Sequence, residues 1–414
     1  MPLFEPKTWP FSLALLPTDA YLVGGSVRDR LLNRHPTYLD LDFVLPADTL
    51  KTAAHIANQH KAGFVVLDAD RQIARVTFAQ MTVDFAQRQG RSTQEDLNKR
   101  DFTVNAIAYS PHTHTLIDPL GGQADLAARI LRMVKRENLA ADPIRLMRGY
   151  RQAAQLGFTL EANTQATITE LAPNLKQVAV ERIRHELDAL LSTPAGTQQL
   201  PDVYKSQLLN AYLPHFNRHS IEQLRAIDGA FEQLAQSMPS YANQLKGWLK
   251  PVPVGFYRSW VKAAKLSQML ADDLKTARQE LEALKYSRSE AQVVLTLLSA
   301  QSDLETMKSK AFGRSHQFFL FKNTGQSFLA FSLLALAKGV EFSIIKSLID
   351  RFQDATDEVA HAKTLLSGNT LINQLGIKPG PDLGALLSAV EQAQAEGKVR
   401  SEQEAITFVK TLYF

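Results

Sequence analysis

The 414-residue sequence contains no cysteine. It therefore has no disulfide, no thiolate metal site and no cysteine nucleophile, which is consistent with a reducing compartment. It also lacks a long hydrophobic run. The longest uncharged apolar stretch, near Phe328–Ala337, is well short of the roughly 20 residues that cross a bilayer. The first ten residues carry Glu5, Lys7 and three prolines and do not resemble a secretory leader. We expect a soluble, cytoplasmic protein with no membrane partner.

The chain also has little excess of one charge, since its net charge is only +4. Local clustering is more informative, because one stretch is strongly basic and is opposed only by Glu137 and Asp142. Its basic residues are Arg129, Arg132, Lys135, Arg136, Arg145, Arg148 and Arg151. This clustering indicates a phosphate-rich partner, although a solvated helix face would give the same pattern.

The length exceeds that of one ordinary core and predicts two to four domains. The first third alternates strand-like runs with a helical pattern at residues 47–62. Strands are expected over residues 20–25, 38–45, 63–69, 74–79, 81–86, 106–110 and 129–134. After about residue 142 the strand patterns stop and helical spacing continues to the end. We place domain boundaries near residue 141, around residues 193–202 and around residues 367–384.

Two aspartates lie one residue apart in the apolar stretch YLDLDFVL. Residues i and i+2 of a strand face the same side, so Asp40 and Asp42 point together while Leu41 and Phe43 point to the core. Adjacent carboxylates repel unless a cation lies between them, and Mg²⁺ prefers hard oxygen ligands. The pair therefore predicts a metal site. Two solvated acids at a strand end are the alternative.

Asp84 alternates with Val83 and Phe85 in the same manner. Three catalytic aspartates on neighbouring strands would form a two-metal site for phosphoryl transfer, in which one metal activates a hydroxyl and the other holds a triphosphate. A surface position on the strand would explain Asp84 equally well.

A Gly24-Gly25 pair lies just upstream of the two aspartates. It lets backbone N–H groups approach phosphate oxygens, and the residues after it can begin a helix whose N-terminus favours anions. Arg28 adds a bidentate donor. Most Gly-Gly pairs are plain turns, so the evidence here is the proximity to Asp40 and Asp42.

Arg100, Asp101 and Asn105 are polar residues in an otherwise apolar stretch. They form either caps and a structural ion pair or contacts to a ribose and a phosphate.

Asp142 and Pro143 predict the start of a helix, with Asp142 as its N-cap and Pro143 at the first helical position. Arg145, Arg148 and Arg151 follow at a spacing of three. An Asp142–Arg145 pair could also recognise a base, because a carboxylate accepts from an exocyclic amine and a guanidinium donates to a ring nitrogen. Cytosine and adenine present this pattern, whereas uracil and guanine present the reverse.

In this order, these stretches resemble the motifs of the class II tRNA nucleotidyltransferases, which include CCA-adding, CC-adding and A-adding enzymes and bacterial poly(A) polymerases. The matching stretches are GGSVRD, LDLDF, KRDFTVNA, DPLGG followed by DL, ADPIRLMR and AVERIRHEL. Residues 368–399 resemble the tail that holds tRNA in this family. The resemblance covers residues 20–190 and 368–410, while residues 200–350 match only as a helical body.

The resemblance implies an α/β nucleotidyltransferase head, a mixed sheet with helices, at residues 1–140. An all-α neck (141–198), body (199–345) and tail (346–414) would follow in an elongated multi-domain protein. It also implies that Asp40 and Asp42 hold Mg²⁺, which Mn²⁺ could replace, and that Asp142 and Arg145 read the base. The nucleotide-binding residues expected are Gly24, Gly25, Arg28, Arg100, Asp101, Asn105, Asp142, Arg145, Arg148 and Arg151.

Three features depart from the family pattern. Ala141 stands where an acid usually precedes Asp142, and Lys99 replaces an arginine. The segment between Asp84 and Asp101 is short, whereas relatives that add all of CCA usually carry a longer flexible loop that is thought to help the switch from C to A. A segment too short to reorganise the pocket would leave it sized for cytosine, so the pattern favours CC addition.

The expected reaction is template-independent transfer of CMP from CTP to the 3′ end of tRNA, with the acceptor arm as partner and a separate A-adding enzyme in the same cell. Full CCA addition or A addition, which would use ATP, is the alternative. The tail disfavours a poly(A) polymerase. A non-catalytic tRNA-binding protein is disfavoured by the intact set of Asp40, Asp42, Arg100, Asp142 and Arg145.

Overall fold

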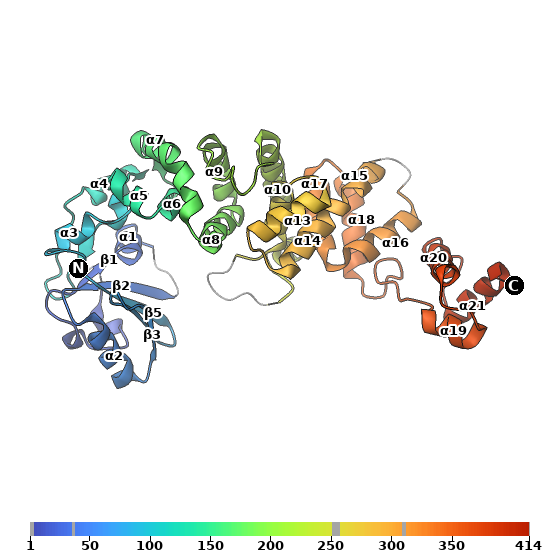
Figure 1. The fold of residues 1–414 in the computed structure, drawn as a ribbon, viewed down its shortest axis with the longest axis horizontal. Helices are drawn as coiled ribbons and strands as arrows, with labels where there is room; N and C mark the ends of the chain where they lie inside the picture. Colours follow the sequence, from blue (N-terminus) through green and yellow to red (C-terminus); the bar gives the residue numbers. More distant parts are fainter. Residues whose placement is uncertain (1–3, 35–37, 251–256, 309–311, 414) are drawn as a thin grey trace. The chain divides into compact units, whose positions relative to one another are not determined.

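The computed structural model describes residues 4–34, 38–250, 257–308 and 312–413. Contacts divide the chain into two compact units. The first extends to Glu186 and includes Lys205–Leu208, and the second contains Leu187–Tyr204 and the chain from Leu209 onward. All of the described strands belong to the first unit, whereas the second is built from helices (Figure 1).

The first unit contains a seven-stranded sheet with the order β3-β4-β5-β2-β1-β6-β7. β2 and β5 run parallel, and the other neighbouring strands are antiparallel, so the sheet is mixed as expected. Its strands are β1 (Tyr21–Val23), β2 (Leu39–Leu45), β3 (Gly63–Asp68), β4 (Ile73–Thr77), β5 (Met81–Gln87), β6 (Ala108–Tyr109) and β7 (Leu116–Ile117). Each strand expected within this sheet is confirmed, and β7 is additional.

Strand structure continues beyond residue 142, where the sequence patterns predicted that it would stop. β8 (Ile130–Leu131) pairs in parallel with β9 (Thr159–Leu160) in a separate small sheet. A strand of two residues is too short to show an alternating pattern, and this explains why β9 was not predicted.

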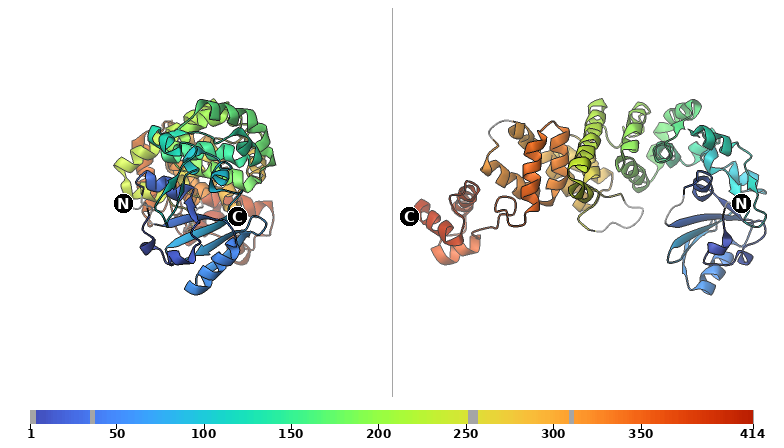
Figure 2. Two further views of the ribbon diagram at one scale, coloured as in Figure 1. Left: turned by 90° about the vertical axis from the view of Figure 1, so that its left-hand side faces the viewer. Right: turned by 180° about the vertical axis from the view of Figure 1, so that it is seen from behind.

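Helices surround the sheet of the first unit, and α2 (Thr49–His60) packs against β4 and β5 (Figure 2). The core between them is aromatic, since the Phe43 and Phe85 rings stack with centroids 5.7 Å apart. The other helices of the unit are α1 (Gly25–Leu31), α3 (Thr93–Leu97), α4 (Gly122–Ala128), α5 (Arg136–Ala141), α6 (Ile144–Leu156) and α7 (Ala162–Leu171). α8 (Val180–Leu191) begins in the first unit and ends in the second.

β3 lies at one edge of the sheet, and none of the described strands pairs with its outer side. Charged residues flank it, with Lys61 before it and Asp68 as its last residue. Its apolar side chains are unusually exposed, at 39% for Phe64, 55% for Val65, 43% for Val66 and 51% for Leu67.

The second unit is a succession of α-helices. They are α9 (Pro194–Lys205), α10 (Arg218–Ser237), α11 (Pro239–Leu245), α12 (Trp260–Ser267), α13 (Leu274–Ala283), α14 (Arg288–Ser299), α15 (Gln301–Lys308), α16 (Arg314–Thr324), α17 (Phe328–Ala337), α18 (Phe342–Gln353), α19 (Gly368–Leu375), α20 (Pro381–Ala395) and α21 (Glu402–Tyr413). The apolar run noted in the sequence forms α17, which is buried against α10 and α12. Within the described residues, no helix is both long and apolar enough to cross a membrane.

Two fully buried lysines on α12 hold this helical unit together. Lys262 Nζ lies 3.1 Å from Asp188 Oδ1 and 2.9 Å from Glu290 Oε1, and Lys265 Nζ lies 2.6 Å from Asp228 Oδ1. Burial raises the pKa of Asp188 in spite of the opposing charge of Lys262. Because a buried charge without a partner is very costly, these pairs fix the packing of α8, α10, α12 and α14.

Candidate active site

The strand β2 presents its two aspartates on one side, as its alternation predicted. Leu41 and Phe43 are buried, whereas Asp40 is exposed and Asp42 is half-buried. The Thr82 hydroxyl on β5 donates to Asp40 Oδ1 at 2.6 Å. Burial, followed by the charges of Asp40 and Asp84, raises the pKa of Asp42 to about 7. The strand therefore holds a carboxylate whose charge is not compensated, as expected for ligands of a cation.

Asp84 is directly opposite Asp42 in the register of β2 and β5, so the three aspartates do come together. Its carboxylate, however, accepts two hydrogen bonds of 2.7 Å from Arg75 on β4. These bonds raise the pKa of Arg75. Across the described residues, no group of three His, Asp or Glu side chains is placed to hold a metal ion. Arg75 thus occupies the Asp84 carboxylate, and metal binding by Asp40, Asp42 and Asp84 stays a prediction.

The turn between β1 and α1 requires glycine at position 24. Gly24 has a φ of +72°, which L-residues with a side chain rarely adopt. A Cβ atom there would lie 3.2 Å from Asp42 Oδ2 and 3.4 Å from Arg100 Nη1. The absence of a side chain at Gly24 therefore lets the turn, Asp42 and Arg100 approach one another, and α1 begins at Gly25.

Arg28 and Asn105 join this turn to a buried polar network. Arg28 donates to Asp29 Oδ1 at 2.9 Å and to Asn105 Oδ1 at 2.7 Å. The Asn105 amide then donates to Asp101 Oδ1 at 3.0 Å and to Gln152 Oε1 at 2.9 Å. The sequence left open whether Asp101 and Asn105 are structural residues or nucleotide contacts. These two roles are not exclusive, because both residues have hydrogen-bond partners and also line the cleft described next.

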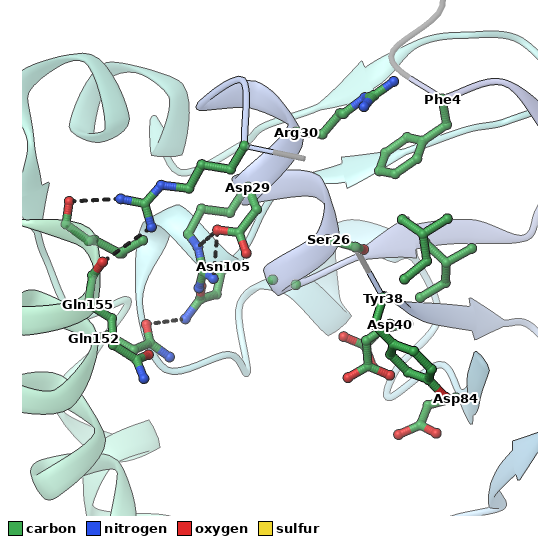
Figure 3. Close-up of a pocket in the computed structure, with 18 of the residues that line it drawn as sticks. Phe4, Ser26, Asp29, Arg30, Tyr38, Asp40, Asp84, Asn105, Gln152 and Gln155 are labelled. Carbon is green, nitrogen blue, oxygen red and sulfur yellow. Dashed lines mark hydrogen bonds and ion pairs between the residues drawn. The ribbon is translucent and has the colours of Figure 1, made fainter. Parts of the chain in front are cut away.

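A cleft of about 970 Å³ brings most of the predicted residues together. Figure 3 shows Asp40 and Asp84 on one side of it and Asn105, Gln152 and Gln155 on the other. Of the residues predicted from the sequence, the lining includes Gly24, Gly25, Arg28, Asp40, Asp42, Asp84, Arg100, Asp101, Asn105, Arg148 and Arg151. The sequence reasoning missed Arg75 and Gln152, which also line it.

The two arginines of α6 that face this cleft are held from behind by Glu186 of α8. Arg151 Nε donates to Glu186 Oε2, and Arg148 Nε lies 3.6 Å from Glu186 Oε1. Arg148 Nη1 also lies 3.6 Å from Asp101 Oδ2. Burial alone would raise the pKa of Asp101, but Arg148, Asn105 and Arg145 hold it below its ordinary value. Asp101 is therefore a stable anion that orients Arg148.

Asp142 and Arg145 line a second cavity, of about 1300 Å³, and not the cleft of Asp40 and Asp42. Arg145 Nη1 donates to the backbone carbonyls of Lys99 (3.0 Å) and Asn138 (3.2 Å). Its Nε is buried without a hydrogen-bond partner among the described residues and lies 4.0 Å from Asp142 Oδ2. Burial lowers the pKa of Arg145, against the opposing charges of Asp101 and Asp142.

The expectation that Asp142 caps the following helix is wrong by one residue. α6 begins at Ile144 with Pro143 as its N-cap, and no side chain caps it. The Asp142 carboxylate instead accepts a hydrogen bond of 3.0 Å from Arg182 Nη2 of α8. This bond joins two charged groups and satisfies the Asp142 carboxylate away from the helix terminus.

Hydrogen bonds between backbone N–H groups and nearby side chains hold the short segment between β5 and α3 in place. The backbone N–H of Gln89 donates to Asp96, that of Arg91 donates to Glu95, and the Ser92 hydroxyl accepts from the backbone N–H of Glu95. A segment fixed in this way has little freedom to rearrange a nearby pocket.

Taken together, these features are those of an enzyme that transfers phosphoryl groups. A mixed sheet presents two adjacent carboxylates, a glycine turn touches one of them, and arginines line the same cleft. The carboxylates suit a hard divalent cation, and the turn and the arginines suit the phosphates of a nucleotide.

Comparison with known proteins identifies the class of enzyme. A model of the "Poly A polymerase head domain" matches residues 20–132. A model of the "Probable RNA and SrmB- binding site of polymerase A" matches residues 157–219, and one of "tRNA nucleotidyltransferase domain 2" matches residues 258–409. A CC-adding tRNA nucleotidyltransferase of Synechocystis sp. is 42% identical over 97% of this chain and 96% of its own length.

More distant relatives differ in the nucleotides they add. An A-adding tRNA nucleotidyltransferase of Deinococcus radiodurans is 31% identical over 95% of both chains, and a CC-adding one of Geobacter sulfurreducens is 31% identical over 93% of this chain and 90% of its own. A solved CCA-adding enzyme in complex with ATP shares the fold, with a TM-score of 0.72 and 20% identity over 95% of this chain and 91% of that one.

The chain belongs to the tRNA nucleotidyltransferase family. The resemblance inferred from the motifs is thereby confirmed, as is the expected fold of a mixed-sheet head followed by helical regions. Members of this family generally use divalent metal ions, with which the two carboxylates of β2 agree.

Proposed function

We propose that the protein adds two cytidylate residues from CTP to the 3′ end of tRNA and releases pyrophosphate. The observation that carries this proposal is the meeting of Asp40 and Asp42 with the Gly24 turn and Arg100 in one cleft. The 42% identical relative, which is a CC-adding enzyme, supports the choice of reaction.

Asp40 and Asp42 would hold the divalent metal ion, with Mg²⁺ expected and Mn²⁺ able to replace it. When bound, this ion would supply charge stabilisation to the reacting phosphate. The chain's own contribution is positioning. The Gly24–Gly25 turn lets the backbone approach the triphosphate, and Arg100 donates to it from the same wall of the cleft.

Base selection would depend on Asp142 and Arg145 in the second cavity. Asp142 would accept from the exocyclic amine of cytosine, and Arg145 would donate to the ring nitrogen through its unpartnered Nε. Uracil presents a carbonyl where cytosine has its amine, so it would meet the Asp142 carboxylate with like polarity. Arg148 and Arg151 lie on the same helix and are fixed by Glu186, but they line the cleft of Asp40 and Asp42 and would contact the nucleotide there.

The short, hydrogen-bonded segment between β5 and α3 supports CC addition over CCA addition. Its residues are tied by hydrogen bonds at Gln89, Arg91 and Ser92 and leave no long loop to resize the pocket for adenine. An A-adding relative at 31% identity and a CCA-adding relative of Streptococcus pneumoniae at 29% keep A addition or full CCA addition as the second candidate. If CC addition holds, a separate enzyme must supply the terminal adenosine.

The acceptor arm of tRNA is the proposed macromolecular partner. A solved Thermotoga maritima CCA-adding enzyme in complex with tRNA shares the fold, with a TM-score of 0.68 and 22% identity. We propose that residues 1–140 form the catalytic head, residues 141–198 the neck, residues 199–345 the body and residues 346–414 a tail that binds tRNA. The helical surfaces would recognise the shape and backbone of the RNA and not its sequence.

Nucleotide addition to a tRNA transcript that ends at the discriminator base tests the proposal. The protein is incubated with CTP, with ATP and with both, and product length is read on a sequencing gel. Two added residues in the presence of both nucleotides are expected. Three would establish CCA addition, and one residue with ATP alone would indicate A addition. Asp40→Ala should abolish addition but not tRNA binding, whereas the exposed control Glu170→Ala should retain both.

A further inference from the structure

Two opposite charges that are meant to read a base face a physical problem, because they attract each other. Asp142 and Arg145 are three residues apart and line the same cavity. If the two side chains formed a close ion pair with each other, neither the carboxylate nor the guanidinium would be available to bind a nucleotide. In the structure they form only a long ion pair, with 4.0 Å between Arg145 Nε and Asp142 Oδ2.

Each charge is held by a different partner. Arg145 is fixed by the backbone carbonyls of Lys99 and Asn138, which receive its Nη1. Asp142 is fixed by Arg182, whose Nη2 donates to Oδ2 at 3.0 Å. This Arg182 bond is a full ångström shorter than the separation between Asp142 and Arg145, so Arg182 is the principal cation partner of Asp142.

The remaining atoms are those that a base would need. Arg182 occupies Oδ2 of Asp142, while no hydrogen bond to Oδ1 is observed within the described residues. The Nε of Arg145 is a buried donor without a partner. An acceptor and a donor are thus left unsatisfied beside each other, which matches the amine and ring nitrogen of cytosine.

We propose that Arg182 is a positioning residue for base selection, which deepens the proposed function and rests on it. By binding Oδ2, Arg182 holds the Asp142 carboxylate in place, leaves Oδ1 for the base and competes with Arg145 for Asp142. Ala141 makes this contact more important, because Arg182 has no second acid beside Asp142 to bind. Arg182 lines the same cavity as Asp142 and Arg145 but not the cleft that contains Asp40 and Asp42, and we place its action at the Asp142 carboxylate.

Replacement of Arg182 tests the inference. Arg182→Gln should raise the KM for CTP about tenfold, the effect of about 1.4 kcal/mol of lost positioning, with a much smaller change in kcat. Preference for CTP over UTP should fall by a similar factor. Arg182→Lys keeps a cation and should restore part of this preference. The control Lys51→Gln breaks an exposed ion pair on α2 that lines neither cavity, and it should change neither value.

Two further measurements separate positioning from folding and from the proposed reaction. Thermal unfolding of Arg182→Gln should match that of the unaltered protein, and in an Asp142→Asn background Arg182→Gln should have no further effect. Equilibrium binding of CTP and UTP is measured in parallel with addition to tRNA. If Arg182→Gln binds CTP with less preference over UTP, the inference is supported. If the unaltered protein adds no nucleotide to tRNA, only the proposed function is refuted, because the binding measurement does not depend on addition. Unchanged KM and CTP preference in Arg182→Gln would overturn the inference, as would an effect that is equally large in the Asp142→Asn background.

Discussion

Asp42→Asn removes a carboxylate that destabilises the metal-free fold. Burial, together with Asp40 and Asp84, raises the pKa of Asp42 from 3.8 to about 7. A shift of about 3 units corresponds to at most about 4 kcal/mol, because each unit equals about 1.4 kcal/mol. Asp42 is only half-buried, so solvent screening should reduce this to about 1–3 kcal/mol. The variant is therefore expected to be more stable than the unaltered protein near neutral pH, although it lacks one of the two proposed metal ligands.

The dependence on pH follows from the direction of the shift. The folded protein keeps the proton of Asp42 between about pH 4 and pH 7, while the unfolded chain releases it, so the unaltered protein loses stability as pH rises through this window. The variant has no such titration. The difference in the free energy of unfolding should be largest above pH 7 and should shrink as the pH falls toward 4.

Thermal unfolding measures the effect. For a unit of this size about 1 kcal/mol shifts the Tm by about 2–4 °C, so we expect a rise of roughly 3–10 °C at about pH 8 without metal. Mg²⁺ should raise the Tm of the unaltered protein but not that of Asp42→Asn, which should also be inactive. Asp48→Asn is the matched control, because Asp48 is exposed and asparagine tolerates its positive φ. Equal Tm values at about pH 8 without metal would refute the idea that burial and the neighbouring carboxylates make the charge of Asp42 destabilising.

Three further predictions concern the cleft and the RNA. Glu186→Gln removes the counter-charge of Arg151 and leaves Arg148 with Asp101 alone, so calorimetry should show a loss of about 1–3 kcal/mol of stability together with a raised KM for CTP. Unchanged values would mean that Glu186 does not hold these arginines. Gly24→Ala forces a Cβ toward Asp42 and a strained φ that costs about 1–2 kcal/mol, and gel assays should show loss of most activity, whereas Gly121→Ala, with open space at its Cβ, should keep it. Binding to tRNA should weaken linearly in a plot of log K against log salt, by about 0.7–0.9 per phosphate contact, and a flat plot would exclude phosphate-driven binding.

The sequence was informative where a side-chain pattern has a single geometric meaning. Alternation in a strand predicted that Asp40 and Asp42 face one way, and this holds whatever the neighbouring strands are. The partners across strands depend on register, which no local pattern contains. Arg75 alternates within β4 like an ordinary surface residue, and only its position opposite Asp84 makes it part of the cleft.

The position of Asp142 shows the same limit. Asp-Pro before a helical pattern predicts a cap, and the backbone does turn into a helix within two residues. The Asp142 carboxylate nevertheless accepts a hydrogen bond from Arg182, which is 40 residues away in the sequence. The buried pairs of Lys262 and Lys265 were equally unpredictable, because a lysine in a helix is normally exposed and only tertiary contacts can show that it is not.

The exposed edge strand β3 has a consequence for the protein's behaviour in solution. Four consecutive apolar residues on an unpaired edge are a template for another strand, and such edges cause aggregation. The charges at its ends, Lys61 before it and Asp68 at its close, act as gatekeepers that oppose stacking of further copies. Replacement of Lys61 by a neutral residue should therefore lower the solubility of the folded enzyme without altering either cavity, because Lys61 lines neither of them.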